Sequence, residues 1–148
     1  AVRWYELQTG ADTQRVGLCL SDDRRYACSP DRLVGSDGGL EVKVLSIAAH
    51  IAALLGMKND EHAVQVQAAM WICGRQWWDL LFYNPLVPSV LLRVERDEGF
   101  IGVLGGAVHE FVERLDQAEL TLANKGTMFK GWEACADNLG VAQLVGGL

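Results

Sequence analysis

The sequence contains no long apolar run. No segment reaches the roughly 18 uninterrupted apolar residues that a membrane span requires, and the first ten residues, AVRWYELQTG, lack the basic and then apolar order of a secretory signal. We therefore expect a protein without a membrane segment that works in the cytoplasm. At 148 residues, of which 50% are hydrophobic, the chain is long enough for one compact domain with its own core but too short for two.

The four cysteines form no metal-binding motif in the sequence. Cys19, Cys28, Cys73 and Cys135 are far apart, include no CxxC pair and have no histidine close by. Zinc and iron–sulfur sites usually draw ligands from closely spaced positions that one turn can gather. We therefore expect four reduced and mostly buried thiols instead of a metal centre.

The sequence also lacks an excess of positive charge, since its formal net charge is -6. A protein that coats nucleic acid without specificity normally offers the phosphates a positive surface, so this charge argues against that class. It does not exclude an enzyme with a local basic channel. Carboxylates gathered at a metal site would themselves add negative charge.

Periodicity and turn residues predict a mixed α/β (α+β) domain. Asp97 is expected to cap a long helix, whose apolar stripe would lie in the core. The predicted helices cover residues 1–9, 46–55, 61–73 and 97–123. The predicted strands cover residues 15–20, 26–29, 32–34, 40–45, 75–83 and 89–96. The stripe consists of Ile101, Leu104, Val108, Phe111, Val112 and Leu115.

Two of the predicted strands carry charges close to one another. The stretch SPDRLVGSDGGLEVKVL is expected to form an antiparallel hairpin around the glycine-rich loop GSDGG. If Val34 lies opposite Leu40, then Asp31 lies opposite Lys43. Side chains alternate along a strand, so Glu41 shares the face of these two charged residues. Two carboxylates and one ammonium group therefore converge.

This trio of charges predicts a site for a divalent metal ion. Mg²⁺ prefers one or two carboxylates with water and phosphate oxygens, and the Val42 carbonyl is a further candidate ligand. A metal bound to Asp31, Glu41 and Val42 would polarise a phosphodiester and activate a water. The ammonium of Lys43 would orient that water or offset negative charge. The alternative is a solvated ion pair on an exposed hairpin, which contributes little to stability.

The same residues resemble the signature of a nuclease family. SPDRLVGSDGGLEVK is similar to the SPDG(L)…(L)E(I/L)K signature of the lambda exonuclease family, also called YqaJ-like viral recombinase exonucleases, in the PD-(D/E)XK superfamily. HAVQVQAAMWICGRQWWDLLFYNP and LLRVERDEGFIGVLGGAVHEFVERL resemble the family's later helices and strands. The resemblance runs from near Ala1 to about Leu122. Arg32 departs from the usual glycine, and Val44 and Leu45 depart from the usual Cys-Pro-like pair.

The resemblance implies a restriction-endonuclease-like core, in which helices flank a mixed central sheet and an antiparallel hairpin carries the active site. Asp31 and Glu41 would be the metal-binding acids, and Lys43 would be the catalytic lysine. Gln65, the first glutamine of QVQ, would position the attacking water or the substrate. Its alternative is a satisfied polar residue on a packed helix. Mg²⁺ would be the cofactor, with Mn²⁺ as a substitute.

The implied nuclease domain covers residues 1–124 and lacks the family's N-terminal helical region, while residues 125–148 form a tail without an assigned role. The implied activity is hydrolysis of duplex DNA ends in phage-type recombination or repair, in the cytoplasm of a bacterial host. The family also implies a homotrimeric ring and a partner that anneals single strands. A structure-specific or nonspecific endonuclease and a non-cutting relative that binds DNA or protein are the alternatives.

Overall fold

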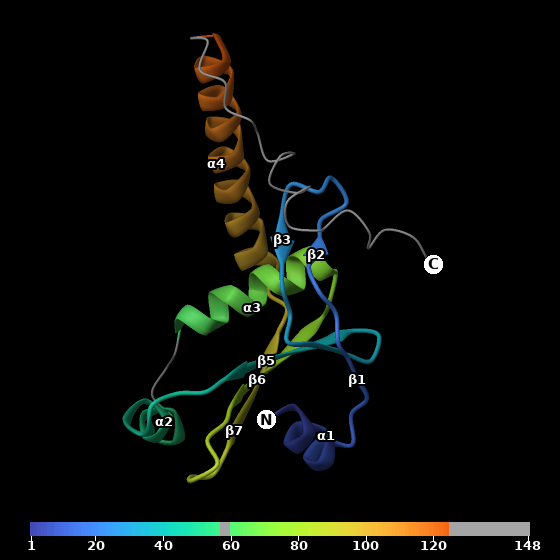
Figure 1. Cartoon of the computed structure of the whole chain (residues 1–148), viewed down its shortest axis with the longest axis vertical. Coiled ribbons are helices and arrows are strands. Elements are labelled where there is room, and N and C mark those ends of the chain that lie inside the picture. The colour runs from blue at the N-terminus through green and yellow to red at the C-terminus, as the bar shows by residue number, and fades with distance from the viewer. Residues whose placement is uncertain (57–59, 125–148) are drawn as a thin grey trace. The chain divides into compact units, whose positions relative to one another are not determined.

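The computed structural model describes residues 1–56 and 60–124 of the chain. The chain divides into two compact units, Ala1–Leu104 and Gly105–Leu148. Within the described residues, all strands belong to the first unit (Figure 1). The described part of the second unit is helical and belongs to the long helix that begins at Glu98.

All four predicted helices are present, and residues suited to helix ends mark their limits. Gly10 ends the first helix with a φ of 67°, a conformation that glycine adopts without strain. The Asp97 carboxylate accepts a hydrogen bond from the Phe100 amide at 2.9 Å and so caps the last helix. The helices are α1 (Val2–Thr9), α2 (Ile47–Leu54), α3 (Asp60–Cys73) and α4 (Glu98–Asn124). The strands are β1 (Thr13–Gln14), β2 (Cys19–Leu20), β3 (Ala27–Cys28), β4 (Arg32–Val34), β5 (Gly38–Lys43), β6 (Trp77–Phe82) and β7 (Val90–Glu95).

Five strands form a mixed sheet in the order β1-β4-β5-β6-β7. Strands β5 and β6 run parallel, and the other neighbours in this sheet run antiparallel. A parallel pair needs a long crossover, which α2 and α3 supply between β5 and β6. Strands β2 and β3 form a separate antiparallel pair. The predicted mixed sheet with an antiparallel hairpin is therefore confirmed.

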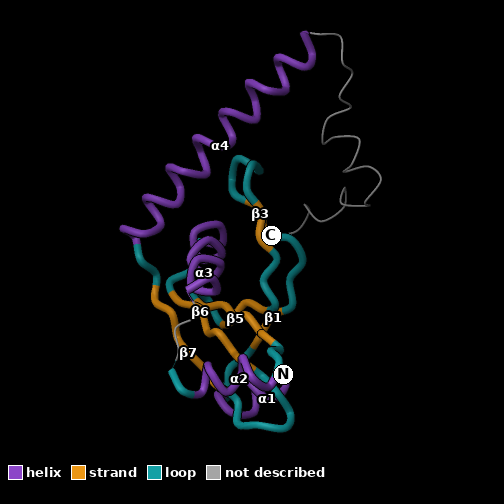
Figure 2. Tube along the Cα trace, turned by 90° about the vertical axis from the view of Figure 1, so that its left-hand side faces the viewer, coloured by secondary structure: helices purple, strands orange, loops and turns teal. Residues whose placement is uncertain are grey.

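Helices cover both faces of the central sheet, with α3 on one side and α1 on the other (Figure 2). Because strand side chains alternate, β4 sends Leu33 toward α3 and Val34 toward α1. The core on the α3 side contains Leu33, Val66, Ala69, Met70 and Trp78. The core on the α1 side contains Tyr5, Val34, Leu40 and Leu81. The face toward α3 also carries the candidate site.

The register of the β4–β5 hairpin differs from the prediction by two residues. Val34 lies opposite Gly38, not Leu40, so the connection has fewer residues than the predicted loop GSDGG. Gly38 and Gly39 belong to the strand because tryptophan rings lie directly over them. A Cβ atom at Gly39 would come within 2.4 Å of the Trp78 ring. A shift of two residues leaves every side chain on its predicted face, so the convergence of charges survives.

A buried charge network lies on the face of the sheet opposite the candidate site. The Asp79 carboxylate on β6 is 2% exposed and accepts a hydrogen bond from the Tyr5 hydroxyl at 2.7 Å. Arg93 of β7 donates to both carboxylate oxygens of Asp79, at 2.8 and 2.9 Å, and stacks over the Trp77 ring. Burial, followed by the bond to Asp79, raises the pKa of the Tyr5 hydroxyl. Every charge in this network is paired, as a low-dielectric position requires.

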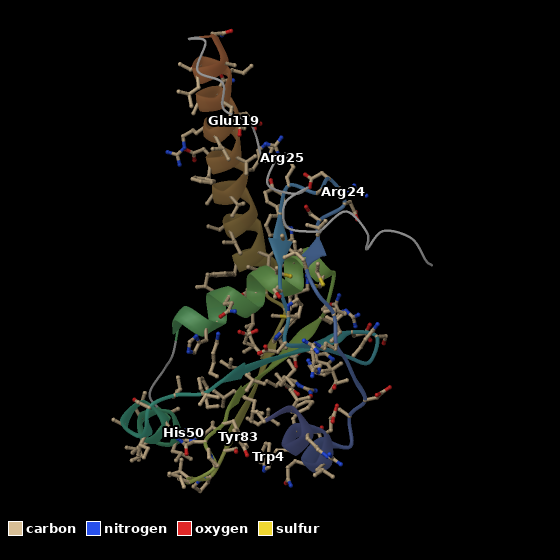
Figure 3. The ribbon with its side chains drawn as sticks, viewed as in Figure 1. Trp4, Arg24, Arg25, His50, Tyr83 and Glu119 are labelled. Atoms are coloured by element: carbon tan, nitrogen blue, oxygen red, sulfur yellow. The ribbon has the colours of Figure 1, made fainter. Side chains whose placement is uncertain are left out.

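The connection after β6 holds α1 and α2 against the sheet (Figure 3). Trp4 of α1 contacts Tyr83 with ring centroids 6.3 Å apart. His50 of α2 is fully buried, and its Nε2 atom lies 2.8 Å from the Pro88 carbonyl oxygen. These two contacts hold α1 and α2 against the connection that follows β6.

The expectation that the apolar stripe of α4 lies in the core is wrong for most of the helix. Ile101 is buried, but Phe111 is 58% exposed and Leu115 is 47% exposed. A helical period shows which residues share a face, but it does not show that another element covers that face. Among the described residues, no helix combines the length and hydropathy needed to cross a membrane.

Candidate active site

The candidate residues lie where β4, β5 and α3 meet. Asp31 directly precedes β4, Glu41 and Lys43 occupy the second half of β5, and Gln65 lies in the first half of α3. The strand period places Glu41 and Lys43 on the face that α3 covers. Asp31 and Gln65 are exposed, whereas Glu41 is buried. The site is therefore open toward solvent on one side and fixed in the sheet on the other.

Three of these side chains form a closed ring of hydrogen bonds. The Lys43 ammonium donates to Glu41 Oε1 at 2.7 Å and to Gln65 Oε1 at 2.8 Å. The Gln65 amide nitrogen donates to the same Glu41 oxygen at 2.8 Å. The exposed side-chain fractions are 12% for Glu41 and 22% for Lys43, so water screens this ion pair less than a surface pair. An amide side chain fits the third position because it donates and accepts at once.

Asp31 joins the group through the main chain of β5. Its Oδ2 atom accepts a hydrogen bond from the Val42 amide at 2.7 Å. The hairpin register, continued by one residue, places Asp31 opposite Glu41 and corrects the predicted pairing with Lys43. The reason is the shorter connection between β4 and β5.

The backbone at Val42 faces the same edge as Asp31. Lys43 turns its carbonyl toward β6, where it accepts from the Tyr83 amide at 2.9 Å. The peptide groups of successive residues in a strand point to opposite edges, and the N–H and C=O of one residue point the same way. The carbonyl of Val42 therefore points toward Asp31, beyond the last paired residue of β4.

The donor atoms of this site suit a hard divalent cation. Lys43 and Gln65 both donate to Oε1 of Glu41, so Oε2 is the oxygen that can meet a metal. Asp31 uses Oδ2 for the Val42 amide and offers Oδ1. Two carboxylate oxygens and one carbonyl oxygen form the kind of set that Mg²⁺ binds together with water. The predicted assignment of Asp31, Glu41 and Val42 as ligands fits this arrangement and stays a prediction.

The second glutamine of QVQ has a structural role that the sequence did not reveal. Two residues span about 200° around a helix, so Gln67 points away from the site that Gln65 faces. Gln67 is 7% exposed, donates to the Glu95 carbonyl at 2.7 Å and accepts from the Asp97 amide at 3.0 Å. It anchors α3 to the end of β7. The sequence signal for a separate role of Gln67 was its spacing of two residues from Gln65, which puts the two side chains on different sides of a helix.

An arginine after β7 holds the other end of α3. Arg96 donates to the Met70 carbonyl at 2.7 Å and to the Arg75 carbonyl at 3.2 Å. Met70 lies in the last turn of α3, where helix carbonyls run short of helical partners, and Arg75 lies two residues after the helix. Gln67 and Arg96 together fix the helix that carries Gln65. They are positioning residues that no sequence motif indicated.

Arg32, the departure from the family signature, lies beside the site. Its guanidinium folds back and donates to the Asp31 carbonyl oxygen at 2.7 Å. This bond keeps the positive charge of Arg32 next to the backbone of Asp31, the candidate acid. Arg24 and Arg25 belong to the connection between β2 and β3 (Figure 3).

Comparisons with known proteins agree with this geometry. The YqaJ-like viral recombinase domain matches residues 1–76 of the chain. No protein of curated function matches the sequence. The alkaline exonuclease LHK-Exo from Laribacter hongkongensis is 30% identical, with a TM-score of 0.80, over 85% of this chain and 68% of that chain. LHK-Exo in complex with dAMP gives the same identity and coverage with a TM-score of 0.79.

A phage-related exonuclease from Haemophilus somnus 129PT is also similar. It is 15% identical over 80% of this chain and 68% of that chain, with a TM-score of 0.61, and at this identity the likeness shows the fold alone. The domain match and the 30% identity to LHK-Exo show family membership as well as the fold. Together they show that the chain belongs to the YqaJ-like viral recombinase family, a lambda-exonuclease-like family with the restriction-endonuclease-like fold.

Proposed function

We propose that the protein is a phage-type exonuclease that hydrolyses phosphodiester bonds at the ends of duplex DNA and depends on Mg²⁺. The observation that carries the proposal is the hydrogen-bonded group of Glu41, Lys43 and Gln65 with Asp31 beside it, in a chain of this family. An incidental ion pair on an exposed strand would need neither the amide nor the second acid.

The metal would be held by Asp31, Glu41 and the Val42 carbonyl. When bound, it would supply Lewis-acid polarisation of a phosphoryl oxygen and a water of lowered pKa. The carboxylates contribute charge that favours the dication. The hydrogen bond from the Val42 amide keeps the Asp31 carboxylate at the edge of β5, so this ligand is oriented in advance.

Lys43 is the residue that we assign to the reacting phosphate. An ammonium has three donor hydrogens, and two of them are directed to Glu41 and Gln65. The third is available for a phosphate oxygen or for the attacking water. A donor that is held in place before the reaction stabilises developing negative charge without reorganisation.

Gln65 acts as a positioning residue in this proposal. Both ends of its amide are engaged, the oxygen by Lys43 and the nitrogen by Glu41. It therefore fixes the direction of the ammonium and of the carboxylate. Since α3 carries Gln65, the anchoring of this helix by Gln67 and Arg96 serves the geometry of the site.

The similarity to LHK-Exo supports DNA as the substrate. That alkaline exonuclease has been solved in complex with dAMP, a deoxynucleotide without a 2′-hydroxyl. A homotrimer around the duplex and a partner that anneals single strands belong to the same proposal. Both follow from the family resemblance.

Digestion of linear and circular duplex DNA by the full chain tests the proposal. Each DNA is incubated with Mg²⁺ or Mn²⁺, with an EDTA control and with the Asp31→Ala variant. We expect metal-dependent loss of linear duplex only, and we expect Asp31→Ala to abolish it. Loss of circular duplex would assign the site to an endonuclease instead. If neither DNA is cut with either metal, the protein is a non-cutting relative.

A further inference from the structure

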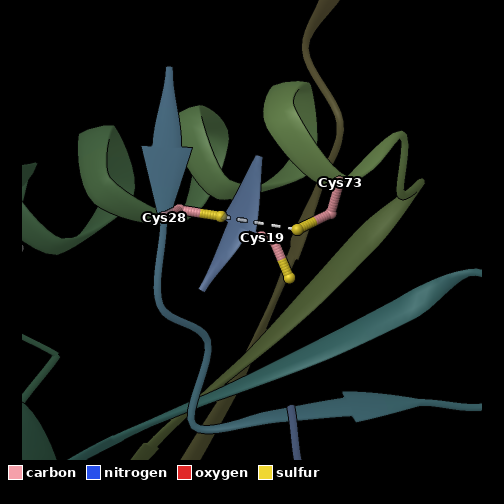
Figure 4. A group of neighbouring side chains, drawn as sticks. All are labelled: Cys19, Cys28 and Cys73. Atoms are coloured by element: carbon pink, nitrogen blue, oxygen red, sulfur yellow. Dashed lines mark hydrogen bonds between the residues drawn. The ribbon is translucent and has the colours of Figure 1, made fainter. Parts of the chain in front are cut away.

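Three cysteines that are far apart in the sequence meet in the fold. Cys19 comes from β2, Cys28 from β3 and Cys73 from the last position of α3. Their sulfur atoms all lie within 4.8 Å of one another, and the three side chains are half-buried (Figure 4). These three thiols are free, as expected, but they are half-buried and not mostly buried, and their sequence spacing gave no sign that they meet.

The fold places these sulfurs through two separate contacts. Antiparallel pairing puts Cys19 directly opposite Cys28, so both side chains leave the β2–β3 pair on the same face. Cys28 and Cys73 pack against the core cluster that contains Met70 and Trp78. The cluster of sulfurs is therefore built on regular elements, and two of its members pack against the core of the first unit.

We propose that Cys19, Cys28 and Cys73 form a binding site for Zn²⁺ with three thiolate ligands. A Zn–S bond of about 2.3 Å in a tetrahedral site separates neighbouring sulfurs by about 3.8 Å. The Cys28 and Cys73 sulfurs are 3.4 Å apart, and no two sulfurs of the group are more than 4.8 Å apart. Shifts of about 1 Å or less, within the reach of small side-chain rotations, bring all three to that spacing.

The surroundings of the cluster suit a bound cation. Cys73 lines an open pocket together with Asp22 and Asp23, so an ion has a path from solvent past two carboxylates. The positive charge of Arg75 acts on Cys19 and Cys73, and it would offset the excess negative charge of three thiolates around a dication. Among the described residues, no further cysteine, histidine or carboxylate joins the group, which supplies three of the four ligands of a tetrahedral site.

A disulfide between Cys28 and Cys73 is the competing use of these thiols. It would leave Cys19 without a role, although the fold brings this residue to the same point. Burial raises the pKa of Cys19 to about 11, and the bond with Cys28, with burial, raises the pKa of Cys73. A bound metal replaces their protons directly.

The proposed zinc site is separate in chemistry from the nuclease site. The carboxylates at Asp31 and Glu41 suit hard cations, whereas thiolates select soft and borderline ones. A metal at the cysteines would join the β2–β3 pair to the end of α3, the helix that carries Gln65. We therefore assign this second metal a structural role, and its test does not depend on nuclease activity.

Cobalt absorption measures thiolate coordination directly. The metal-free full chain is titrated with Co²⁺ in the presence of a reductant that does not bind metal. We expect a near-ultraviolet charge-transfer band that saturates at about one Co²⁺ per chain and is displaced by Zn²⁺. Cys28→Ser and Cys73→Ser should each abolish the band. Asp31→Ala and Glu98→Gln, which change described residues outside the cluster, should retain it.

A second measurement covers variants that fail to fold. Zn²⁺ should raise the Tm of the unsubstituted chain by several degrees, since a ligand that binds the folded state stabilises it. The proposal is overturned if the unsubstituted chain shows neither the band nor the rise in Tm. It is also overturned if Asp31→Ala removes the band as completely as Cys73→Ser. A Cys28–Cys73 disulfide in the freshly purified protein, detected by alkylation and mass spectrometry, would assign the thiols to redox chemistry instead.

Discussion

Replacing Lys43 by methionine separates a catalytic lysine from an ordinary ion pair. Methionine keeps an unbranched stem of similar length and removes the ammonium. At 2.7 Å and an effective dielectric constant of about 20, the attraction to Glu41 amounts to about 6 kcal/mol. The cost of removing both ions from water offsets most of this energy. The net effect on stability is therefore small compared with the direct attraction.

The magnitude for the variant follows from what remains at Glu41. This carboxylate is 12% exposed and keeps the hydrogen bond from Gln65. We expect Lys43→Met to lower the free energy of unfolding by about 1–3 kcal/mol, as for a buried group that loses one partner. A solvated ion pair would contribute only about 0.2–1 kcal/mol. For activity, the loss of a fixed donor predicts a decrease in kcat of about 10²–10³-fold.

Urea unfolding without metal and initial rates on linear duplex DNA with Mg²⁺ give the two quantities. Glu98→Gln is the matched control because it breaks an ion pair with Arg96 whose carboxylate side chain is 74% exposed. It should change the free energy of unfolding by less than about 1 kcal/mol and leave the rate unchanged. If Lys43→Met cuts DNA within about threefold of the unsubstituted rate, Lys43 has no catalytic role, contrary to the argument from its third donor hydrogen.

Three further predictions concern the framework of the site. Gly39→Ala should lower the free energy of unfolding by about 1–3 kcal/mol in urea, because the new methyl group overlaps the Trp78 ring. The control Gly102→Ala, whose methyl group meets no atom within 4 Å, should be neutral or stabilising. Equal effects of the two substitutions would contradict the packing of β5. Gln67→Ala should lower the free energy of unfolding by about 1–3 kcal/mol through the loss of two buried hydrogen bonds, and an unchanged urea midpoint would show that α3 is anchored elsewhere. Because the fold raises the pKa of Tyr5, the contribution of its hydroxyl to stability is fully present below the ordinary tyrosine pKa of 10.0 and is lost as the pH rises above that value, by up to about 1.4 kcal/mol per pH unit. Tyr5→Phe should remove this part of the alkaline slope, and an unchanged slope would mean that the hydroxyl ionises freely.

Much of the fold could be predicted from the sequence because local signals agree with the tertiary structure. Gly10 and Asp97 lie at helix ends, and their residue types explain why the helices stop or start there. The faces of β5 could also be assigned, because a strand has a strict period of two. The face assignment of Glu41 and Lys43 was therefore correct even with the wrong hairpin register.

The register itself could not be predicted, because glycine is common both in flexible turns and at strand positions covered by a large side chain. Gly38 and Gly39 suit a flexible turn, and the predicted hairpin places them in its loop. In the fold they lie in a strand beneath Trp77 and Trp78, where no larger residue fits. Which of the two applies depends on a neighbouring strand that is distant in the sequence.

The candidate site shows the same division between local and long-range information. Glu41 and Lys43 are close in sequence, so their convergence follows from strand geometry. The contact of Gln65 with both depends on how α3 crosses the sheet, and it was available only through the family resemblance. The meeting of Cys19 with Cys73 depends on packing as well, and no spacing rule for cysteines could have found it.

The bond between the Val42 amide and Asp31 has a consequence for which changes the site tolerates. A backbone amide is present whatever side chain follows it, proline excepted, so position 42 can vary without loosening the acid. Inserting one residue into the turn before β5 is different, because a shift of one position exchanges the two faces of a strand. The nuclease signature should therefore accept other apolar side chains between its glutamate and its lysine, where Val42 packs against the core, while resisting a change in the length of the hairpin that carries them.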